Sequence, residues 1–290
     1  MMIKQSSLSV CVVTTIFPDN LNFFQDFLDG LSCQTYWNFD LIIYNDGCNY
    51  DELVKKLHGF NFDIISDPSN FFTEIRNYIF KYLAKKNYDI IFFGDSDDYF
   101  NCDRLAKSLE KHLTGSDIVF NDINIIDQGG QLIIENYWAD RFNGDQINPK
   151  KILKYNFLGL GNTSIKSEIL KTEFKFMRDL LMIDWAFYLQ IIFKHKNLKI
   201  SFSENPINYR QHSNNAIGLK KSWNSELIKK RIQLKINLLE SYRYLDPEFE
   251  DEIENSKRIL KLLSKPDNME KHLKKLKFEN LFWFEETIIE

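Results

Sequence analysis

Short apolar segments alternate with helix-like segments along the first hundred residues. Four segments rich in β-branched and aromatic residues are too short for helices and end in polar turns, which is typical of buried strands. They are Ser9–Thr15, Asp40–Tyr44, Phe62–Ser66 and Tyr88–Phe93. Between the first two, apolar residues recur at helical spacing from Phe23 to Leu31. This alternation predicts a parallel sheet covered by helices on both faces.

Residues that favour helix N-termini predict where these helices begin. Asp19 or Asn20 is expected to cap the first helix. Thr73 is expected to cap the helix before the fourth strand, and Asn101 the helix after it. The helix after Asn101 would turn three leucines inward, namely Leu105, Leu109 and Leu113.

The pattern becomes mixed after Asp98. Apolar and polar residues alternate over Asp117–Ile126, and Gln128-Gly129-Gly130-Gln131 predicts a hairpin turn before a strand at Leu132–Ile134. A helix over Asp184–His195 and a short last strand over Leu198–Phe202 follow. From Ser225 onward the chain reads as charge-rich helices. We expect one α/β domain over residues 1–220 and a helical C-terminal extension over 221–290.

Composition and charge narrow the function classes. The 290 residues are 44% hydrophobic and 27% charged, which is ordinary for a globular protein. The 37 Lys and Arg nearly balance the 41 Asp and Glu, for a formal net charge of -4, so no broad basic field favours nucleic acid. No apolar run approaches the roughly 18–20 residues of a membrane span. The first residues lack the pattern of a secretory signal.

The four cysteines lie far apart and fit no zinc-binding pattern. They are Cys11, Cys33, Cys48 and Cys102. Reduced thiols in a cytoplasmic protein are the simplest interpretation.

The candidate chemistry centres on the acidic segment Gly94-Asp95-Ser96-Asp97-Asp98, directly after the most apolar strand. Ligands bind outside the carboxyl ends of strands in open α/β sheets. Three adjacent carboxylates repel one another unless a cation neutralises them, and oxygen ligands suit Mg²⁺ or Mn²⁺. The alternative is a solvated turn that caps the next helix.

No glycine-rich phosphate-binding loop follows the first strand, because neither GxGxxG nor GxxxxGK[ST] occurs there. A nucleotide would therefore need a metal ion and side-chain charge, and Arg76 could supply that charge. The alternative for Arg76 is a surface ion pair with Glu74 or Asp89.

Five segments occur in an order that is informative as a set. They are Thr14-Thr15, Gln34-Thr35-Tyr36, Tyr44-Asn45-Asp46-Gly47, Arg76-Asn77 and Phe93-Gly94-Asp95-Ser96-Asp97-Asp98. This order resembles the catalytic domain of family 2 glycosyltransferases, which have the GT-A fold. The resemblance implies a Rossmann-like, mostly parallel sheet flanked by helices, with a nucleotide-sugar-binding half over residues 1–120 and a mixed acceptor half over 121–220.

The later segments extend the resemblance to about Gly218. They are Gly161-Asn162-Thr163-Ser164, Ile183-Asp184-Trp185 and Tyr209-Arg210-Gln211-His212. The resemblance implies that Asp184 is the general base, that Asn162 and Trp185 face the acceptor, and that Asp97 and His212 hold the metal ion. It assigns donor binding to Thr14, Thr15, Asp46, Arg76, Asp95, Ser96, Asp97 and Arg210, with Asp46 at the nucleotide base. Ile183 and Asn45 stand where the family has acids, and Glu74-Ile75 is bulkier than the family pattern.

The implied reaction is an inverting transfer of a sugar from a UDP- or dTDP-linked donor, with Mn²⁺ or Mg²⁺, to a glycan or lipid-linked oligosaccharide acceptor. The clustered lysines of the C-terminal extension leave two roles open, a contact with the inner membrane face or a helix docked on the core or on a second copy. A metal-dependent nucleotidyltransferase and a catalytically degenerate binding protein are the alternative functions. Retention of Asp97, Asp184 and Arg76 speaks against the degenerate protein.

Overall fold

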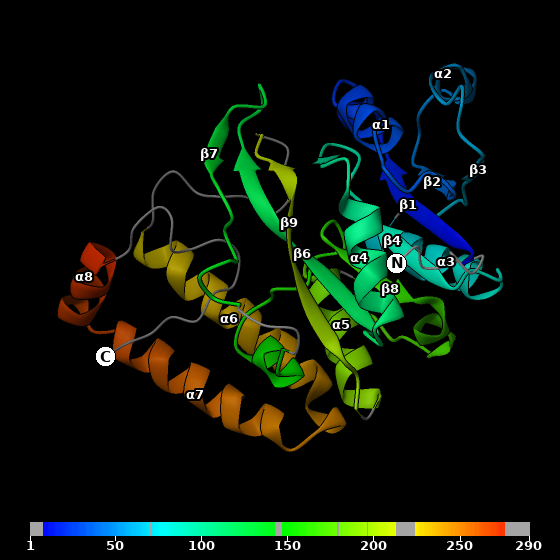
Figure 1. Ribbon diagram of the computed structural model, residues 1–290. Helices are drawn as coiled ribbons and strands as arrows, with labels where there is room; N and C mark the ends of the chain where they lie inside the picture. Colours follow the sequence, from blue (N-terminus) through cyan, green and yellow to red (C-terminus); the bar gives the residue numbers. More distant parts are fainter. Residues whose placement is uncertain are drawn as a thin grey trace. The chain divides into compact units, whose positions relative to one another are not determined.

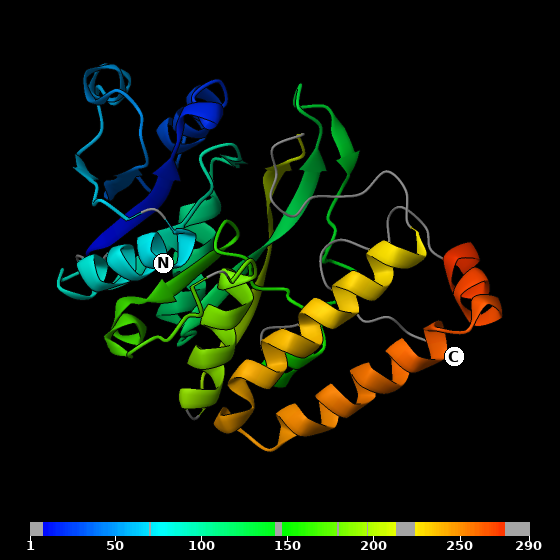
Figure 2. The same cartoon turned by 180° about the vertical axis from the view of Figure 1, so that it is seen from behind.

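The computed structural model describes residues 8–69, 71–142, 147–178, 180–195, 197–212 and 224–275. Its contacts divide the chain into two compact units. The first consists of Met1–Ile147, Gly159–Leu181 and Leu198–Arg210, and the second of Asn148–Leu158, Met182–Asn197 and Gln211–Glu290. Figures 1 and 2 show the ribbon from two opposite sides. The whole sheet belongs to the first unit, and the described part of the second unit is helical.

A nine-stranded sheet runs in the order β3-β2-β1-β4-β8-β6-β9-β5, with β7 paired to β6. Its first half is parallel. β1 (Val10–Ile16) lies between β2 (Asp40–Asn45) and β4 (Ile90–Phe93), and β3 (Phe62–Ile65) pairs with β2. All four β4 residues are buried, as expected for a central strand. The predicted strands and their parallel pairing are confirmed.

The second half of the sheet is mixed. β8 (Thr163–Lys166) is antiparallel to both β4 and β6 (Ile118–Ile126), whereas β9 (Ile200–Arg210) runs parallel to β6. β5 (Tyr99–Phe100) pairs antiparallel with β9 at the edge. β7 (Leu132–Ile134) forms the predicted hairpin with β6. β9 is longer than predicted and carries its last residue, Arg210, to the acidic segment.

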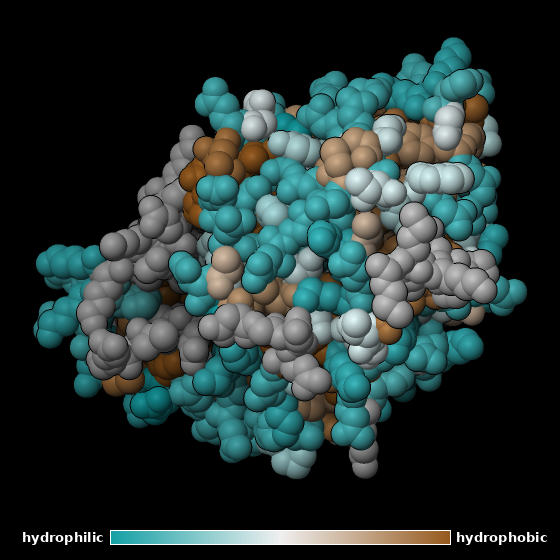
Figure 3. Space-filling view, viewed as in Figure 1, coloured by the Kyte–Doolittle hydropathy of each residue, from teal (hydrophilic) through white to brown (hydrophobic). Residues whose placement is uncertain are grey.

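β7 carries exposed apolar side chains. Leu132 is 55% exposed and Ile133 is 43% exposed. Figure 3 shows the resulting apolar surface over β7. The strand has only three residues, and short edge strands limit unwanted pairing between molecules.

Four α-helices belong to the first unit. They are α1 (Phe24–Ser32), α2 (Tyr50–Lys56), α3 (Phe72–Ala84) and α4 (Arg104–Leu113). α4 lies in front of the sheet in Figure 1, and α3 lies in front of it in the reverse view of Figure 2. Helices therefore cover both faces of the sheet, as the alternation of strands and helices predicts.

The first helix starts later than predicted. Pro18–Asn20 forms a separate 3₁₀ turn, and α1 begins at Phe24 without a side-chain cap. Asn20 is buried and its amide nitrogen donates to the Ser96 hydroxyl at 3.3 Å. The residue expected to cap a helix thus supports the acidic segment.

The other two predicted caps are also wrong. Thr73 is the second residue of α3, and its hydroxyl donates to the Arg178 carbonyl at 2.9 Å. Asp103, rather than Asn101, precedes α4. Leu113, expected to face inward, is 52% exposed because the helix ends there and the chain turns away.

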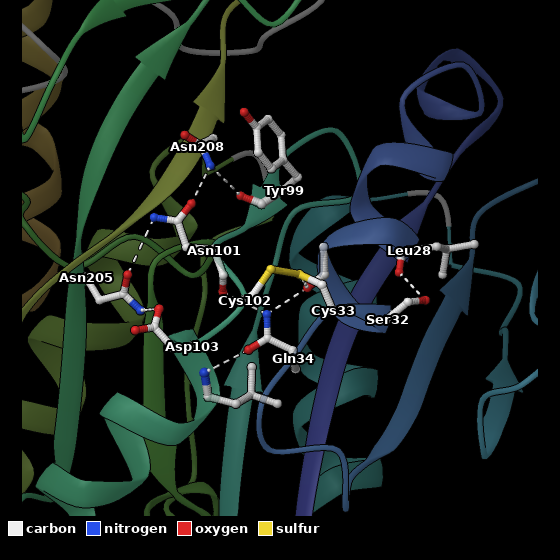
Figure 4. The surroundings of a disulfide bond; sticks show 12 residues. Leu28, Ser32, Cys33, Gln34, Tyr99, Asn101, Cys102, Asp103, Asn205 and Asn208 are labelled. Carbon is white, nitrogen blue, oxygen red and sulfur yellow. Dashed lines mark hydrogen bonds between the residues drawn. A yellow bond between two sulfur atoms is a disulfide. The ribbon is translucent and has the colours of Figure 1, made fainter.

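A disulfide joins Cys33, at the end of α1, to Cys102, just before α4 (Figure 4). The two Cα atoms are 5.0 Å apart, within the range of natural disulfides. The Gln34 amide reinforces the junction, because its nitrogen donates to the Gly30 and Asn101 carbonyls and its oxygen accepts from the Leu105 backbone.

The prediction of four reduced thiols is therefore wrong for Cys33 and Cys102. Cys11 and Cys48 are free. Residues separated by 69 positions meet only because α1 packs beside β5, which residue spacing does not reveal. The expected cytoplasmic location had rested on reduced thiols and loses that support.

The described residues of the second unit form two 3₁₀ turns and four α-helices. They are η2 (Pro149–Leu153), α5 (Ile183–Lys194), α6 (Ser225–Tyr242), η4 (Arg243–Leu245), α7 (Glu248–Leu263) and α8 (Pro266–Lys275). A buried ion pair between Lys235 and Glu252, at 2.5 Å, joins α6 to α7. Within the described ranges, no helix has the length and apolar character that crossing a membrane requires.

Candidate functional site

The acidic segment Gly94–Asp98 follows β4 at the carboxyl end of the parallel strands, where the sequence predicts it. Asp95 is half-buried, whereas Ser96, Asp97 and Asp98 are buried. The Asp98 backbone N–H donates to the Asp95 carbonyl at 3.1 Å, so the segment closes into a turn. The three carboxylates are therefore held on one short, partly desolvated loop.

The Asp98 carboxylate is buried and only one of its oxygens is hydrogen-bonded. Its Oδ1 accepts from the Arg210 backbone N–H at 2.8 Å, whereas its buried Oδ2 has no hydrogen-bond partner. Burial raises the pKa of Asp98 well above the ordinary value, and the nearby charges of Asp97 and Asp95 raise it further. A cation at this loop would relieve that repulsion.

Three potential ligands do not converge on one point anywhere in the part of the chain that the structure describes. One or two carboxylates of the acidic loop could still bind a cation together with substrate phosphates and water. This fits Mg²⁺ and Mn²⁺ chemistry, in which one or two carboxylates combine with substrate phosphates and water.

Gly161 lies against this loop, which sequence analysis did not reveal. A Cβ built at position 161 would lie 2.5 Å from Asp95 Oδ2 and 3.4 Å from Asp98 Oδ2. Asn162 shapes the backbone here, because its side chain accepts from Gly159 N–H and donates to the Asn121 carbonyl, each at 3.0 Å. Asn162 is 2% exposed, and its side-chain amide holds the backbone around Gly161. The sequence resemblance implies instead that Asn162 faces the acceptor.

Arg76 and Thr15 meet at the same edge of the sheet. Arg76 Nη1 donates to Thr15 Oγ1 at 3.2 Å. The two acids considered as alternative partners for Arg76 have other contacts: Glu74 pairs with Arg178 at 3.9 Å, and Asp89 accepts from Ser9 N–H.

Thr14 differs from its neighbour Thr15. Successive strand residues point to opposite faces, and Thr14 is buried with a hydroxyl oxygen that has no partner. Arg76 and Thr15, one half-buried cation and one hydroxyl, are therefore available together at the strand ends.

Asp46 lies in the turn after β2. Its backbone N–H donates to the Ile16 carbonyl at 2.8 Å, which fixes it beside the end of β1. Asn45, which replaces an acid of the family pattern, closes the turn by accepting from Cys48 N–H and donating to the Cys48 carbonyl. Gly47 follows with φ +89°, a conformation that favours glycine. The Asp46 side chain is half-buried and so remains partly accessible to a ligand.

Arg210 ends β9 and is 2% exposed. Its Nε donates to the Asp97 carbonyl at 2.8 Å, Nη1 to the Gln128 carbonyl at 2.9 Å and Nη2 to Asp26 Oδ2 at 2.5 Å. Sequence reasoning placed Arg210 at the donor diphosphate, whereas its guanidinium here holds protein atoms. Asp26, on α1, carries no sequence signal that would have identified it.

The remaining predicted residues belong to the second unit. Asp184 is half-buried in the first turn of α5, and Met182 precedes the helix, so Asp184 does not act as its cap. Trp185 is fully buried and donates from Nε1 to the Ile152 carbonyl at 2.7 Å, which does not support the expected stacking on an acceptor sugar. His212 is half-buried. Gly218, where the resemblance ends, lies outside the described residues.

Comparison with known families identifies the chain. Residues 11–174 match the model of the family described as Glycosyl transferase family 2. The chain belongs to glycosyl transferase family 2. The matched residues include the acidic loop, Arg76 and Asn162. No curated protein matches the chain by sequence.

Solved structures agree with a family 2 fold. TarS 1–349 of S. aureus in complex with UDP-GlcNAc is 15% identical, with a TM-score of 0.58 over 80% of this chain and 66% of that one. The mannosyltransferase PcManGT of Pyrobaculum calidifontis, in complex with GDP-Man and Mn²⁺, is 12% identical, with a TM-score of 0.57 over 87% and 69%. The chain spans only 40% of a longer TarS chain. These likenesses show the GT-A-like fold that the sequence predicts.

Proposed function

We propose that this family 2 chain transfers a sugar from a nucleotide-diphosphate donor, UDP- or dTDP-linked, to a glycan acceptor with inversion at the anomeric carbon. The observation that carries the proposal is the acidic loop, where Asp98 Oδ2 is buried without a partner beside two further carboxylates. The neighbours in complex with UDP-GlcNAc and with GDP-Man support a nucleotide-sugar donor.

The donor-binding residues would each contact a different part of the nucleotide. Asp46, in the turn after β2, would accept hydrogen bonds from the base. Arg76 and Thr15 would donate to the diphosphate, and their hydrogen bond supports a shared position for them. Asp95 and Ser96 would bind near the ribose and phosphates.

Mn²⁺ or Mg²⁺ fits the donor set of the acidic loop, and Asp97 and His212 would hold it. When bound, the ion supplies positive charge that stabilises the departing diphosphate. PcManGT, in complex with Mn²⁺, supports a divalent cation. Arg76 would add a second positive charge where negative charge develops.

Asp184 would act as the general base that accepts the proton of the attacking acceptor hydroxyl. Its place in the first turn of α5 stabilises the carboxylate through the helix dipole and so lowers its basicity. Proton transfer would therefore accompany attack rather than precede it. One base opposite one leaving group gives a single displacement and inversion.

The test compares two variants with a charge-matched control. Asp97→Ala should abolish Mn²⁺-dependent binding of UDP or dTDP, measured by calorimetry. Asp184→Asn should keep that binding and lose transfer from a panel of nucleotide sugars by about 10²–10⁴-fold. Asp51→Asn, which removes an exposed carboxylate on α2, should change neither.

The outcomes separate the alternatives. Binding without any sugar transfer or donor hydrolysis contradicts the assigned reaction. Absence of both binding and turnover favours a degenerate binding protein, and transfer of a nucleotidyl group favours a nucleotidyltransferase. Equal loss of binding and transfer in Asp184→Asn would assign that residue a structural role.

The acceptor and location stay predictions. We propose a surface glycan or a lipid-linked oligosaccharide as acceptor, and contact with the inner membrane face through the clustered lysines of the C-terminal extension. Within the described part of that extension, Lys274 pairs with Glu270 at 2.6 Å, which offsets some of the basic charge. Vesicle co-sedimentation with anionic and neutral lipids tests the membrane contact.

A further inference from the structure

Arg210 connects two other parts of the first unit, the β6–β7 turn and α1, to the acidic loop. Its backbone N–H and Nε hold Asp98 and Asp97 from one side. Its Nη1 binds the Gln128 carbonyl in the β6–β7 turn, and its Nη2 binds Asp26 on α1. The guanidinium is planar and its donors are fixed relative to one another, so moving one contact moves the others.

Of the guanidinium's hydrogen bonds to Asp97, Gln128 and Asp26, the one to Asp26 reaches a carboxylate, whereas the other two reach backbone carbonyls. The Nη2–Oδ2 distance is 2.5 Å, and charge-assisted contacts of this kind are stronger than neutral ones. Arg210 is 2% exposed at its side chain and Asp26 is 52% exposed. The pair is thus anchored on its buried side, while water screens part of the attraction.

Helix α1 is a rigid support for Asp26. A Cβ built at Gly30 would lie 2.7 Å from the Phe100 backbone nitrogen, so the helix lies directly on β5. Phe27 and Phe100 pack edge to face with ring centroids 5.5 Å apart. The Cys33–Cys102 disulfide fixes the end of the same helix. Asp26 therefore projects from an element that is fastened to the strand following the acidic loop.

We infer that Asp26 is a positioning residue for the acidic loop, acting through Arg210. The inference rests on the proposed function, in which Asp97 binds a divalent cation and the donor diphosphate. Without the Asp26 carboxylate, the buried guanidinium loses a charge-assisted partner and shifts, and the Asp97 carbonyl that its Nε holds shifts with it. The cost appears as weaker binding at the loop, because the general base Asp184 belongs to another part of the chain.

The test measures Mn²⁺ binding in the presence of UDP or dTDP, together with donor KM and kcat. Asp26→Asn should weaken Mn²⁺–nucleotide binding and raise donor KM by about three- to tenfold, with kcat within about twofold. Asp26→Glu keeps the charge and should restore most of the affinity. Asp29→Asn removes another exposed carboxylate from α1, one that pairs with Gln25 instead, and should resemble the unmodified protein.

Each result decides the matter. Equal affinity in Asp26→Asn and Asp29→Asn overturns the positioning role, as does a loss that Asp26→Glu fails to restore. Unfolding in urea, followed for all three variants, identifies any loss of binding that comes only from a destabilised fold, and such a loss also counts against the inference. If the unmodified protein binds neither Mn²⁺ nor nucleotide, the proposed function fails and this inference with it.

Discussion

Gly161 and Asp95 come from distant parts of the sequence and are in direct contact in the fold. A carboxylate-rich segment after an apolar strand is a local pattern, so the sequence identifies Asp95, Asp97 and Asp98. The contact with Gly161 depends on β8 pairing beside β4, and the contact with Arg210 depends on the full length of β9. Residues that contact the acidic loop but lie far from it in the sequence are therefore not predicted from the sequence.

Gly161→Ala should disturb the acidic loop. The added methyl group would lie 2.5 Å from Asp95 Oδ2 and 3.2 Å from its Cγ, so the carboxylate must move. We expect weaker Mn²⁺ binding and a loss of about 1–3 kcal/mol in the free energy of unfolding. Calorimetry and urea unfolding measure the two effects.

Gly129→Ala is the matched control for that variant. Its Cβ would come no nearer than 3.4 Å to Asp127 Oδ1, an ordinary contact. If both variants bind Mn²⁺ like the unmodified protein, the close approach of Gly161 to Asp95 has no functional consequence.

At the scale of elements, strands were easier to predict than helix starts. β1, β2 and β4 are mostly apolar runs with buried centres, which makes them recognisable as strands of a parallel sheet. The helix starts were wrong because Asn20 and Thr73 bond to Ser96 and to the Arg178 carbonyl, which are tertiary partners. The pairing of β8 between β4 and β6 involves antiparallel neighbours far apart in the chain, which residue periodicity does not specify.

His112 joins two elements, α4 and β8. Its Nδ1 donates to the Ser116 carbonyl and its Nε2 accepts from the Ser164 hydroxyl, an assignment that follows from the partners. The residue is 5% exposed, and burial lowers the pKa of His112 from 6.5 to about 4. His112 therefore has the structural role that its helical position suggests, and it makes the free energy of unfolding depend on pH.

Stability should fall on acidification through His112. The unfolded chain binds this proton first as the pH drops, so the contribution is complete above about pH 6.5 and is lost progressively toward pH 4, by about 3 kcal/mol. His112→Gln keeps a donor and an acceptor but does not titrate. Urea unfolding between pH 7 and pH 5 should show a smaller loss in this variant, and equal slopes would contradict the assignment.

At the scale of the whole molecule, the Cys33–Cys102 disulfide closes a loop with a sequence separation of 69. Cross-linking a loop of this length contributes about 4 kcal/mol through restriction of the unfolded chain. We expect a reducing agent to lower the free energy of unfolding by an amount of this order. The double variant Cys33→Ser and Cys102→Ser should start from the lower value.

Urea unfolding with and without reductant measures this effect. Cys48→Ser changes a free thiol and should keep the response to reductant that the unmodified protein has. A response that survives in the double variant, or that is absent from the unmodified protein, would contradict a disulfide at this position.

The acidic loop also determines how the sheet must bend. β4 and β5 are separated by three strands in the sheet, which corresponds to four spacings of about 4.8 Å, or about 19 Å if the sheet were flat. Only residues 94–98 connect them, and these fold into a turn. The far rim of the sheet must therefore coil back until Phe100 lies beneath Gly94. The short loop keeps β5 close to the end of β4, and an insertion in it would let the coiled sheet open. Adaptation to a larger or smaller sugar would therefore have to come from the residues that surround the loop.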